Sequence, residues 1–425
     1  MWRRMAILAA WVLVVAGPAG AEDDVRALAA KLNDPSPAVR IAAAAALRDR
    51  SPDVKEVLPQ LADALRNEYF DVRMAAAEAL RKVGPGAVGV LTEALAKDDY
   101  WSRDVAAMTL GRIGPAAAKA APALGKALKY SSADVRGRAA AALARIGAVR
   151  GALANLAAML TEPRAGVREA ACEALARGGL DAARLVVPLL DHADGEVRGS
   201  AAETLGRIGP DAAPMAVPAL LGALRAEIAE TNKLYGAIDN EGIRRSRMGH
   251  AAGDSPVVAA LGRMGPMAAA AVASLFDSAD ETTLRFALTV LGRLGAEAAP
   301  ASDVVLELFR SKTEPWMRAQ AAWVLGAVAG ANPKALPALR EALNDAAEPV
   351  RRNSAYVLAG AGPQGRAALA AALKSDSAAC CLAAVQGLAR AAAQSDAAAA
   401  LAEAARDADP AVRDAAANAL GSTRK

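Results

Sequence analysis

Histidine, the side chain most often used in metal and acid-base sites, is nearly absent from this chain. The 425 residues include two histidines, His192 and His250, and neither is followed by the acid or second histidine that zinc and iron sites need at fixed spacing. The sequence also lacks a Gly-x-x-x-x-Gly-Lys loop for phosphate and a Cys-x-x-Cys-His site for haem. We therefore expect a chain that is not an enzyme and that has no metal and no cofactor.

Cysteine is equally scarce, which excludes a disulfide framework. The chain has three cysteines, Cys172 and the adjacent pair Cys380 and Cys381. Side chains of adjacent residues in a helix diverge by about 100°, so the pair is predicted to be two separate thiols. A redox role for the pair is the alternative.

Aromatic residues and an excess of charge are also lacking. Aromatics make up 3% of the chain although hydrophobic residues reach 54%, so the apolar character is mostly alanine. The 50 basic and 46 acidic residues nearly balance, which argues against nucleic acid as a partner. The expected partner is another protein.

The N-terminus carries the pattern of a secretory signal. Met1 to Arg4 form a basic head, Met5 to Ala16 are an apolar run too short to span a membrane as a helix, and Ala19 to Ala21 resemble a cleavage site. We expect cleavage after Ala21 and export to the periplasm, the cell envelope or the medium, with no membrane span in the mature chain. An uncleaved anchor is the alternative.

What the chain has in abundance is a repeated block that begins with Val-Arg and continues with small apolar residues. The steps between the arginine positions are 30 to 34 residues, except one of 56, so twelve units fit. This period is typical of a solenoid, in which each unit buries its apolar face against its neighbours. The arginine positions are Arg40, Arg73, Arg103, Arg136, Arg168, Arg198, Asp254, Leu284, Arg318, Arg351, Cys381 and Arg413.

Each unit is predicted to be a helical hairpin. In a block, the apolar positions share one face of a helix of 3.6 residues per turn. Three blocks begin with a capping residue, Ser36, Glu314 or Asp409, that is followed directly by a proline in the first turn of the helix. Many blocks end in Gly-Pro. A second helical stretch between the blocks has a recurring proline of its own, at Pro59, Pro122, Pro188, Pro218 and Pro337.

The pairing of these two helices resembles the HEAT-repeat family, particularly the short units of bacterial phycobilisome lyase HEAT-like repeat proteins. The resemblance covers roughly residues 25–421. It implies an all-α solenoid, a right-handed superhelix of about twelve hairpins, with the second (B) helices on the concave side. Asp254, Leu284 and Cys381 depart from the pattern, and Arg285 indicates a one-residue slip in the second of these units.

The resemblance also implies rival functions. One is a HEAT-like enzyme or accessory protein, either similar to phycobilisome lyases or related to oxidoreductases. The HEAT-repeat deoxyhypusine hydroxylases carry paired His-Glu dipeptides that hold iron, and this sequence contains no His-Glu dipeptide. We therefore favour a non-catalytic scaffold that binds another protein.

The recurring arginines are predicted to be structural. They flank the buried stripe of each B helix, beside turn acids of their own units such as Asp34, Asp345 and Asp407. An anion-binding ladder is the alternative.

Two groups of aromatic residues are candidates for partner binding. One lies at or before the hairpin turns of consecutive units and forms a predicted ridge, with gap filling as an equal alternative. In the other, two rings fall five residues after their arginines and should lie side by side on the concave face, with crowding between closely spaced helices as the alternative. The ridge is Tyr69, Phe70, Tyr100, Trp101 and Tyr130; the second group is Trp316, Trp323 and Tyr356.

The long step predicts an insertion around residues 225–252, as a loop or an extended helix on one face. Arg244, Arg245 and Arg247 in it could meet an acidic partner. The alternative, slightly favoured, is that nearby acids neutralise them locally. Those acids are Glu227, Glu230, Asp239 and Glu241. Residues 22–425 are thus expected to form one solenoid domain.

Overall fold

The computed structural model describes residues 25–49, 56–277, 280–311, 314–329 and 332–422, so the predicted signal peptide, residues 1–21, lies outside the described residues. Every regular element in those ranges is a helix, which confirms the all-α solenoid. The chain forms two compact units, one up to Arg177 and one from Gly178 onwards, and each is described by itself. The prediction of a single solenoid domain stays a prediction.

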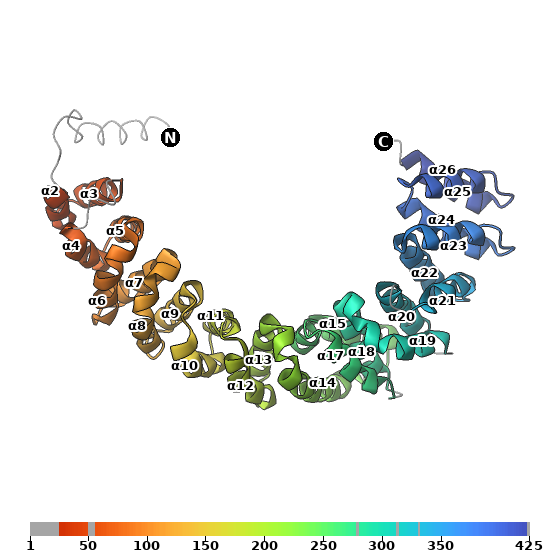
Figure 1. Cartoon of the computed structure of the whole chain (residues 1–425), viewed down its shortest axis with the longest axis horizontal. Helices are drawn as coiled ribbons and strands as arrows, with labels where there is room; N and C mark the ends of the chain where they lie inside the picture. The colour runs from red at the N-terminus through yellow and green to blue at the C-terminus, as the bar shows by residue number, and fades with distance from the viewer. Residues whose placement is uncertain (1–24, 50–55, 278–279, 312–313, 330–331, 423–425) are drawn as a thin grey trace. The chain divides into compact units, whose positions relative to one another are not determined.

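The first unit stacks hairpins of a first (A) helix and a B helix. In Figure 1 its B helices line one side of the stack and its A helices the other. The A helices are α2 (Val25–Ala30), α4 (Leu58–Asp63), α6 (Val88–Ala96), α8 (Ala121–Ala127) and α10 (Leu153–Ala158). The B helices are α3 (Pro37–Asp49), α5 (Phe70–Val83), α7 (Tyr100–Ile113), α9 (Ala133–Ile146) and α11 (Ala165–Ala176).

The second unit continues the same pattern within itself. Its A helices are α12 (Gly179–Val186), α14 (Ala213–Tyr235), α17 (Pro266–Ala273), α19 (Ser302–Arg310), α21 (Ala335–Glu341), α23 (Gly362–Ala372) and α25 (Ser395–Ala404). Its B helices are α13 (Gly195–Ile208), α15 (Glu241–Asp254) with α16 (Pro256–Leu261), α18 (Glu281–Leu294), α20 (Pro315–Val328), α22 (Glu348–Gly360), α24 (Ala378–Arg390) and α26 (Pro410–Ser422). The described residues of both units therefore make twelve hairpins, as predicted.

Short 3-10 helices join or extend the A helices. They are η1 (Lys31–Asn33), η3 (Ala64–Arg66), η4 (Gly84–Ala87), η5 (Gly114–Ala120), η6 (Arg150–Ala152), η7 (Met159–Thr161), η8 (Val187–Asp191), η9 (Pro210–Ala212), η10 (Ser274–Asp277), η11 (Gly295–Ala301) and η12 (Ala342–Asn344). The recurring prolines of the A stretches mostly stand in a first turn, as Pro59 does in α4 and Pro122 in α8. Pro218 lies inside α14.

Small side chains let neighbouring B helices approach closely. In α5 the apolar stripe of Val72, Ala76 and Leu80 is fully buried. Between α7 and α9 the approach is so close that a Cβ added to Gly111 would lie 2.9 Å from the Cα of Ala142. The core is thus a seam of alanine, valine and leucine that runs along the stack.

The predicted helix ends are largely confirmed. The glycines of the Gly-Pro pairs all have positive φ, which a residue with a side chain rarely adopts. They are Gly84, Gly114, Gly209, Gly265 and Gly362. Asp409 caps α26, where its Oδ1 accepts from the N–H of Ala411 at 2.8 Å. Glu314 was wrongly predicted as a cap: its side chain makes no cap bond, and its carboxylate binds Arg245 instead.

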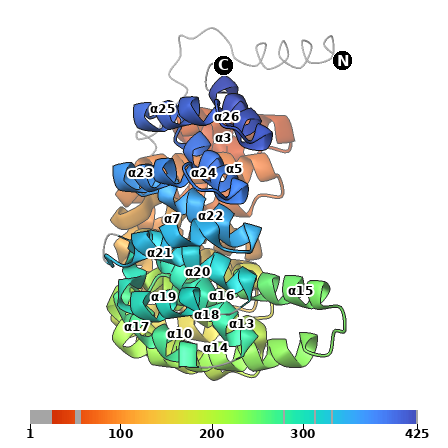
Figure 2. The ribbon, with the colours of Figure 1, turned by 90° about the vertical axis from the view of Figure 1, so that its right-hand side faces the viewer.

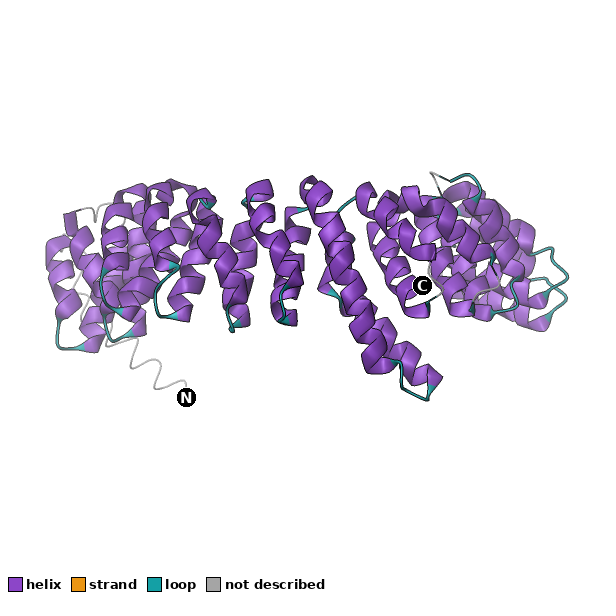
Figure 3. Cartoon of the chain, turned by 90° about the horizontal axis from the view of Figure 1, so that it is seen from below, coloured by secondary structure: helices purple, strands orange, loops and turns teal. Residues whose placement is uncertain are grey.

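The insertion lengthens both helices of one hairpin. Helix α14 continues to Tyr235, α15 begins at Glu241, and the hairpin projects beyond its neighbours (Figures 2 and 3). This confirms the extended helix as against the loop. Pro256 divides the B helix of this hairpin into α15 and α16, because proline cannot continue the helical hydrogen bonds.

One segment, Pro210–Tyr235, is long and apolar enough to cross a membrane by length and composition. The expectation that no later segment could span a membrane is therefore too strict. In the fold, 44% of the most apolar window of this segment is buried. Helix α14 packs against α16, α17 and α18, like a core helix of the stack.

Candidate functional site

The recurring arginines bind the hairpin turn that precedes their own helix. In α9, Nη1 of Arg136 donates to the carbonyl oxygens of Tyr130 at 2.8 Å and Ser131 at 2.7 Å. These acceptors lie six and five residues before the arginine. The same pair of bonds recurs at Arg40, Arg73, Arg168, Arg198, Arg351 and Arg413. We call these residues, with Arg103 and Arg318, the ladder arginines.

The other edge of several guanidinium groups reaches a carboxylate of the next unit. Nη2 of Arg136 is 2.7 Å from Glu162, and Nη2 of Arg318 is 2.8 Å from Asp345. The acids predicted as partners within the same unit contribute their main-chain carbonyl oxygens and not their carboxylates. The pairs are Asp34 with Arg40, Asp345 with Arg351, and Asp407 with Arg413. The structural interpretation is confirmed, with the carboxylate supplied by the following hairpin.

The aromatic ridge of the first unit lies against these arginines. The guanidinium carbon of Arg73 is 4.0 Å from the ring centre of Trp101 in the next hairpin. Arg40 faces Tyr69 at 4.5 Å and Arg103 faces Tyr130 at 4.4 Å in the same way. These three rings therefore link consecutive units, a role that sequence reasoning did not foresee.

Other parts of the ridge stay open to solvent. Phe70 is 64% exposed, although Arg73 lies 5.8 Å from its ring centre. Tyr100 packs edge-on against Trp101 at 4.8 Å, and both are exposed. Phe70, Tyr100 and Trp101 thus keep exposed ring surface, and binding of a partner along the ridge stays a prediction.

Trp316 belongs with the ladder and not with Trp323 and Tyr356. Its ring lies 3.6 Å from the guanidinium carbon of Arg285. In this unit the ladder position is the buried Leu284, and Arg285 stacks on the ring of the next hairpin as other ladder arginines do. This agrees with the predicted one-residue slip. Burial lowers the pKa of Arg285, while a hydrogen bond to Glu281 opposes that shift.

Two of the three arginines in the insertion are neutralised locally. Arg245 pairs with Glu241 at 2.5 Å and with Glu314 at 3.1 Å, and Arg244 lies 3.9 Å from Glu281. Glu241 was a predicted partner, and the other two acids come from α18 and the start of α20. Arg247 is exposed and pairs with no carboxylate in the described ranges.

Two acids predicted to neutralise these arginines serve other groups. Glu230 binds Arg198 at 3.2 Å. Glu227 is half-buried beside Ser255, whose hydroxyl donates to it at 2.7 Å. Burial raises the pKa of Glu227, and the bond from Ser255 opposes the rise.

Trp323 and Tyr356 do lie side by side, as their positions in the repeat predicted. Their ring centres are 4.7 Å apart, on helices α20 and α22. Trp323 is 46% exposed. The guanidinium carbon of Arg390, from α24, lies 3.7 Å from the ring centre of Tyr356, and Nη2 of Arg390 donates to the tyrosine hydroxyl at 2.7 Å.

A hollow of about 340 Å³ opens beside these two rings. We call it the Trp323 groove. Small residues near the ends of consecutive B helices form its floor, and a Cβ added at Gly326 would overlap the side chain of Val357. Its lining residues are Gly292, Trp323, Gly326, Ala327, Tyr356, Val357, Gly360 and Ala361. Sequence reasoning missed Arg390 and the glycines.

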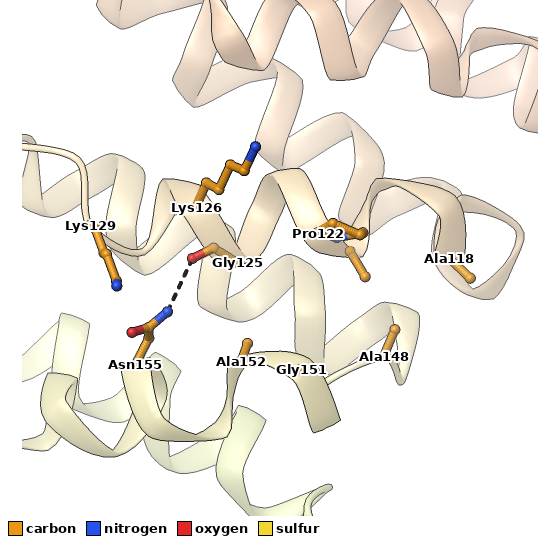
Figure 4. A pocket seen from close by; sticks show the side chains of 10 residues that line it. Ala118, Pro122, Gly125, Lys126, Lys129, Ala148, Gly151, Ala152 and Asn155 are labelled. Carbon is orange, nitrogen blue, oxygen red and sulfur yellow. Dashed lines mark hydrogen bonds between the residues drawn. The ribbon is translucent and has the colours of Figure 1, made fainter.

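Further hollows lie on the A-helix side. The largest of those described, about 650 Å³, separates α8 from η6 and α10 (Figure 4). Asn155 donates across it to the carbonyl oxygen of Gly125 at 3.5 Å, and Lys126 and Lys129 stand at its edge. It has no aromatic lining and no acid-base pair, so it offers less to a partner than the Trp323 groove.

Cys380 and Cys381 are free, buried thiols, which confirms the prediction of two separate thiols, and Cys172 is buried in α11. Cys381 takes a ladder position, and its Sγ lies 3.2 Å from the carbonyl oxygen of Ser375, six residues earlier. Burial raises the pKa of this thiol. The thiol therefore replaces one bond of a ladder arginine.

Within the described ranges, no group of three histidine, cysteine or acidic side chains is arranged to hold a metal ion. Nδ1 of His192 accepts from the N–H of Asp194 at 3.0 Å, in a turn. Nδ1 of His250 lies 2.7 Å from the carbonyl oxygen of Ser246, within α15.

Comparison with known proteins identifies the repeat. No curated protein matches the chain. A solved structure of the karyopherin Kap121p, bound to the extreme C-terminus of the protein phosphatase Cdc14p, is similar with a TM-score of 0.58 and 14% identity, over 94% of this chain and 50% of that one. Kap121p bound to Pho4p gives 0.57 and 14%, over 93% and 49%.

The chain spans about half the length of these karyopherin structures, and the likeness concerns the fold. The sequence profile described as HEAT repeats matches residues 25–104, 88–176, 153–233 and 268–360, more than half of the chain. The chain therefore belongs to the HEAT-repeat family.

Proposed function

We propose that this protein is a non-catalytic scaffold that binds another protein along the B helices of its second unit, at the Trp323 groove. The observation that carries the proposal is the exposed Trp323, held by Tyr356 at 4.7 Å beside a hollow floored by glycine and alanine. Tryptophan and tyrosine are the residues that most often dominate protein interfaces. A ring fixed before binding loses little further entropy when a partner packs on it.

The HEAT-repeat fold supports the same proposal. A stack of hairpins offers an extended surface, and such surfaces bind proteins in many solenoids. The similar karyopherin structures are of Kap121p bound to the extreme C-terminus of Cdc14p and of Kap121p bound to Pho4p. For the present chain, the partner is a proposal.

We also propose that the protein works outside the cytoplasm. The basic head, apolar run and Ala-Gly-Ala site of residues 1–21 support this. Mass spectrometry of the chain purified from its own cells should give a mature protein that begins at Glu22. A chain that keeps Met1 and stays in the cytoplasm would contradict export.

A photoactivatable amino acid at Ala327, on the groove floor, tests the binding site. In the cells that make the protein, it should crosslink to one protein species, and mass spectrometry then identifies that partner. The same reagent at Met267, which is 47% exposed on α17, serves as the control. Equal yields of that species from both positions would contradict the proposal.

A further inference from the structure

Most B helices carry a lysine or arginine in or just after their last turn. In the ten consecutive units whose ladder positions run from Arg73 to Cys381, this cation is missing only in the two units that form the Trp323 groove. Nine residues after each ladder position the sequence has a lysine or arginine in eight of these ten units. In the other two units, the residues are Ala327 and Gly360. The row is Lys82, Arg112, Arg145, Arg177, Arg207, Arg263, Arg293, Ala327, Gly360 and Arg390.

The two missing side chains create the hollow. Ala327 and Gly360 both line it, and the long side chains usual at their positions would project over its floor. Trp323 and Tyr356 precede them by four residues, about one helical turn. An aromatic wall and a cleared floor therefore occur in the same two units.

Two cations of the row have a carboxylate partner, and the two cations that flank the gap have none among the described residues. Arg112 pairs with Glu78 at 3.0 Å and Arg207 with Glu203 at 2.6 Å. Arg293 and Arg390 are both exposed, and neither pairs with a carboxylate of any described residue. Arg293 donates to the carbonyl oxygen of Gly253, and Arg390 stacks on Tyr356.

Both paired cations use a glutamate that stands five residues after a ladder position, Glu78 for Arg112 and Glu203 for Arg207. Around the groove, the corresponding residues are Thr289, Trp323, Tyr356 and Gln386. After their first turns, α18, α20, α22 and α24 contain no aspartate or glutamate. The surface that carries the exposed tryptophan is therefore basic at both ends and has no acid of its own between them.

We infer that the Trp323 groove binds an extended peptide segment of its protein partner with acidic residues at both ends and uncharged, flat side chains in the middle. The middle packs on Trp323 and Tyr356, and the carboxylates pair with Arg293 and Arg390. Such pairs of arginine and carboxylate are bidentate in favourable geometry. This inference rests on the proposed function, since it names the partner chemistry of the same site.

Helix spacing sets the length of the segment. Neighbouring helix axes lie roughly 8–10 Å apart, so the three steps from α18 to α24 span about 25–30 Å. An extended chain covers about 3.3 Å per residue, which gives about eight or nine residues. A nonapeptide is therefore long enough to reach both arginines.

Three fluorescein-labelled nonapeptide pools test the inference on the full mature chain by fluorescence anisotropy. The pools share randomised uncharged central residues and differ only in two residues at each end: glutamate, glutamine or lysine. The glutamate pool should bind at least tenfold more tightly than the glutamine pool. The lysine pool should bind most weakly, and added salt should weaken the glutamate pool, because exposed charges are screened.

Variants of the flanking arginines assign the effect to the groove. Arg390→Gln and Arg293→Gln should each lower the affinity of the glutamate pool at least fivefold, whereas Arg390→Lys, which keeps the charge, should lose less. Arg207→Gln is the matched control, because Glu203 already neutralises that arginine, and it should change affinity less than twofold. Circular dichroism should show equal helicity for all variants.

The inference is overturned if no pool binds, if the glutamine or lysine pool binds as tightly as the glutamate pool, or if both glutamine variants bind the glutamate pool like the wild type. With any of these outcomes, the proposed function still holds if replacing Trp323 weakens binding of the partner that was crosslinked at Ala327. A partner that ignores Trp323 and Tyr356 would instead remove the proposed function itself.

Discussion

At the scale of single residues, one arginine in most hairpins connects up to three groups, and Arg40 contacts all three. Its Nη1 holds the turn of its own unit, its Nη2 often reaches a carboxylate of the next unit, and in several units an aromatic ring covers its flat face. Lysine has one compact cationic group and cannot replace this planar fork. The arginine at this place therefore acts as a joint between successive hairpins.

Replacing Arg136 tests this role. Arg136→Met keeps the length of the side chain but leaves two turn carbonyls and Glu162 without their donor. We expect a loss of about 2–4 kcal/mol in local stability, measured by amide hydrogen exchange in α9 and the turn before it. The control is Arg138→Met, since Arg138 is 53% exposed and forms a surface pair with Asp104. It should cost less than about 1 kcal/mol.

Cys381 offers the reverse experiment, in which a missing arginine is restored. Cys381→Arg should place Nη1 at the carbonyl of Ser375 and Nη2 near Asp407, whose carboxylate, like that of Asp345, accepts from the N–H two residues later. Amide exchange in residues 373–377 should slow. In contrast, Cys380→Arg should destabilise α24, because Cys380 takes the buried position that valine holds in other units. Faster exchange in Cys381→Arg would contradict the account of the ladder.

Glu227 should give the second unit a dependence on pH. Burial raises its pKa in the folded state above the unfolded value of about 4.3. The folded state therefore binds this proton more tightly, and ionisation costs stability as the pH rises above that value. Glu227→Gln should be more stable than the wild type at pH 7, with a difference that shrinks toward pH 4 in thermal denaturation. Glu230→Gln, which breaks the pair with Arg198, should give no such gain.

At the scale of helices and hairpins, the stack depends on glycine and alanine where B helices approach closely. Gly111→Ala gains helix propensity of up to about 1 kcal/mol, but its Cβ would lie 2.9 Å from the backbone of Ala142, which cannot give way as a side chain could. We expect a net loss of about 1–3 kcal/mol from overpacking, measured by amide exchange in α7 and α9. Gly137→Ala meets its nearest neighbour at 3.8 Å and should be neutral or stabilising.

Most of the hairpins could be predicted from the sequence, because Val-Arg starts, Gly-Pro ends and recurring prolines mark their limits. Glu314 was wrongly predicted as a helix cap because its carboxylate pairs with Arg245 of the insertion. A pairing with a residue so far away in the sequence cannot be read from the local pattern. The break at Pro256 was also missed, since the long step hid where the B helix of that unit begins. Side chains that contact a neighbouring hairpin are the hardest to predict from the sequence of a single unit.

The candidate site was predictable only in part. Trp323 and Tyr356 share a position in the repeat, so their contact followed from helix geometry. Trp316 was grouped with them because it is near in sequence, although it points to Arg285 on the preceding B helix. Arg390 and the glycine floor could have been found by asking where the row of last-turn cations stops.

At the scale of the whole molecule, each unit is built from neighbour-to-neighbour contacts, as expected for a repeat protein. The described side-chain bonds of the ladder join a hairpin to itself or to the next one. Such a stack presents a row of similar surfaces, and function arises where the row changes. In the second unit, that change occurs at Trp323 and Tyr356, where an exposed and a half-buried ring stand beside a floor from which the last-turn cations are missing.

Central to this account is the claim that the Trp323 groove binds a protein. The most direct measurement is the dissociation constant of the partner identified by crosslinking at Ala327, for the wild type, for Trp323→Ala with Tyr356→Ala, and for Met267→Ala. The account predicts a loss of at least about 2 kcal/mol, roughly 30-fold, for the double variant. Met267→Ala should bind within about twofold of the wild type, with equal helicity. A double variant that binds its partner as tightly as the wild type would contradict the claim.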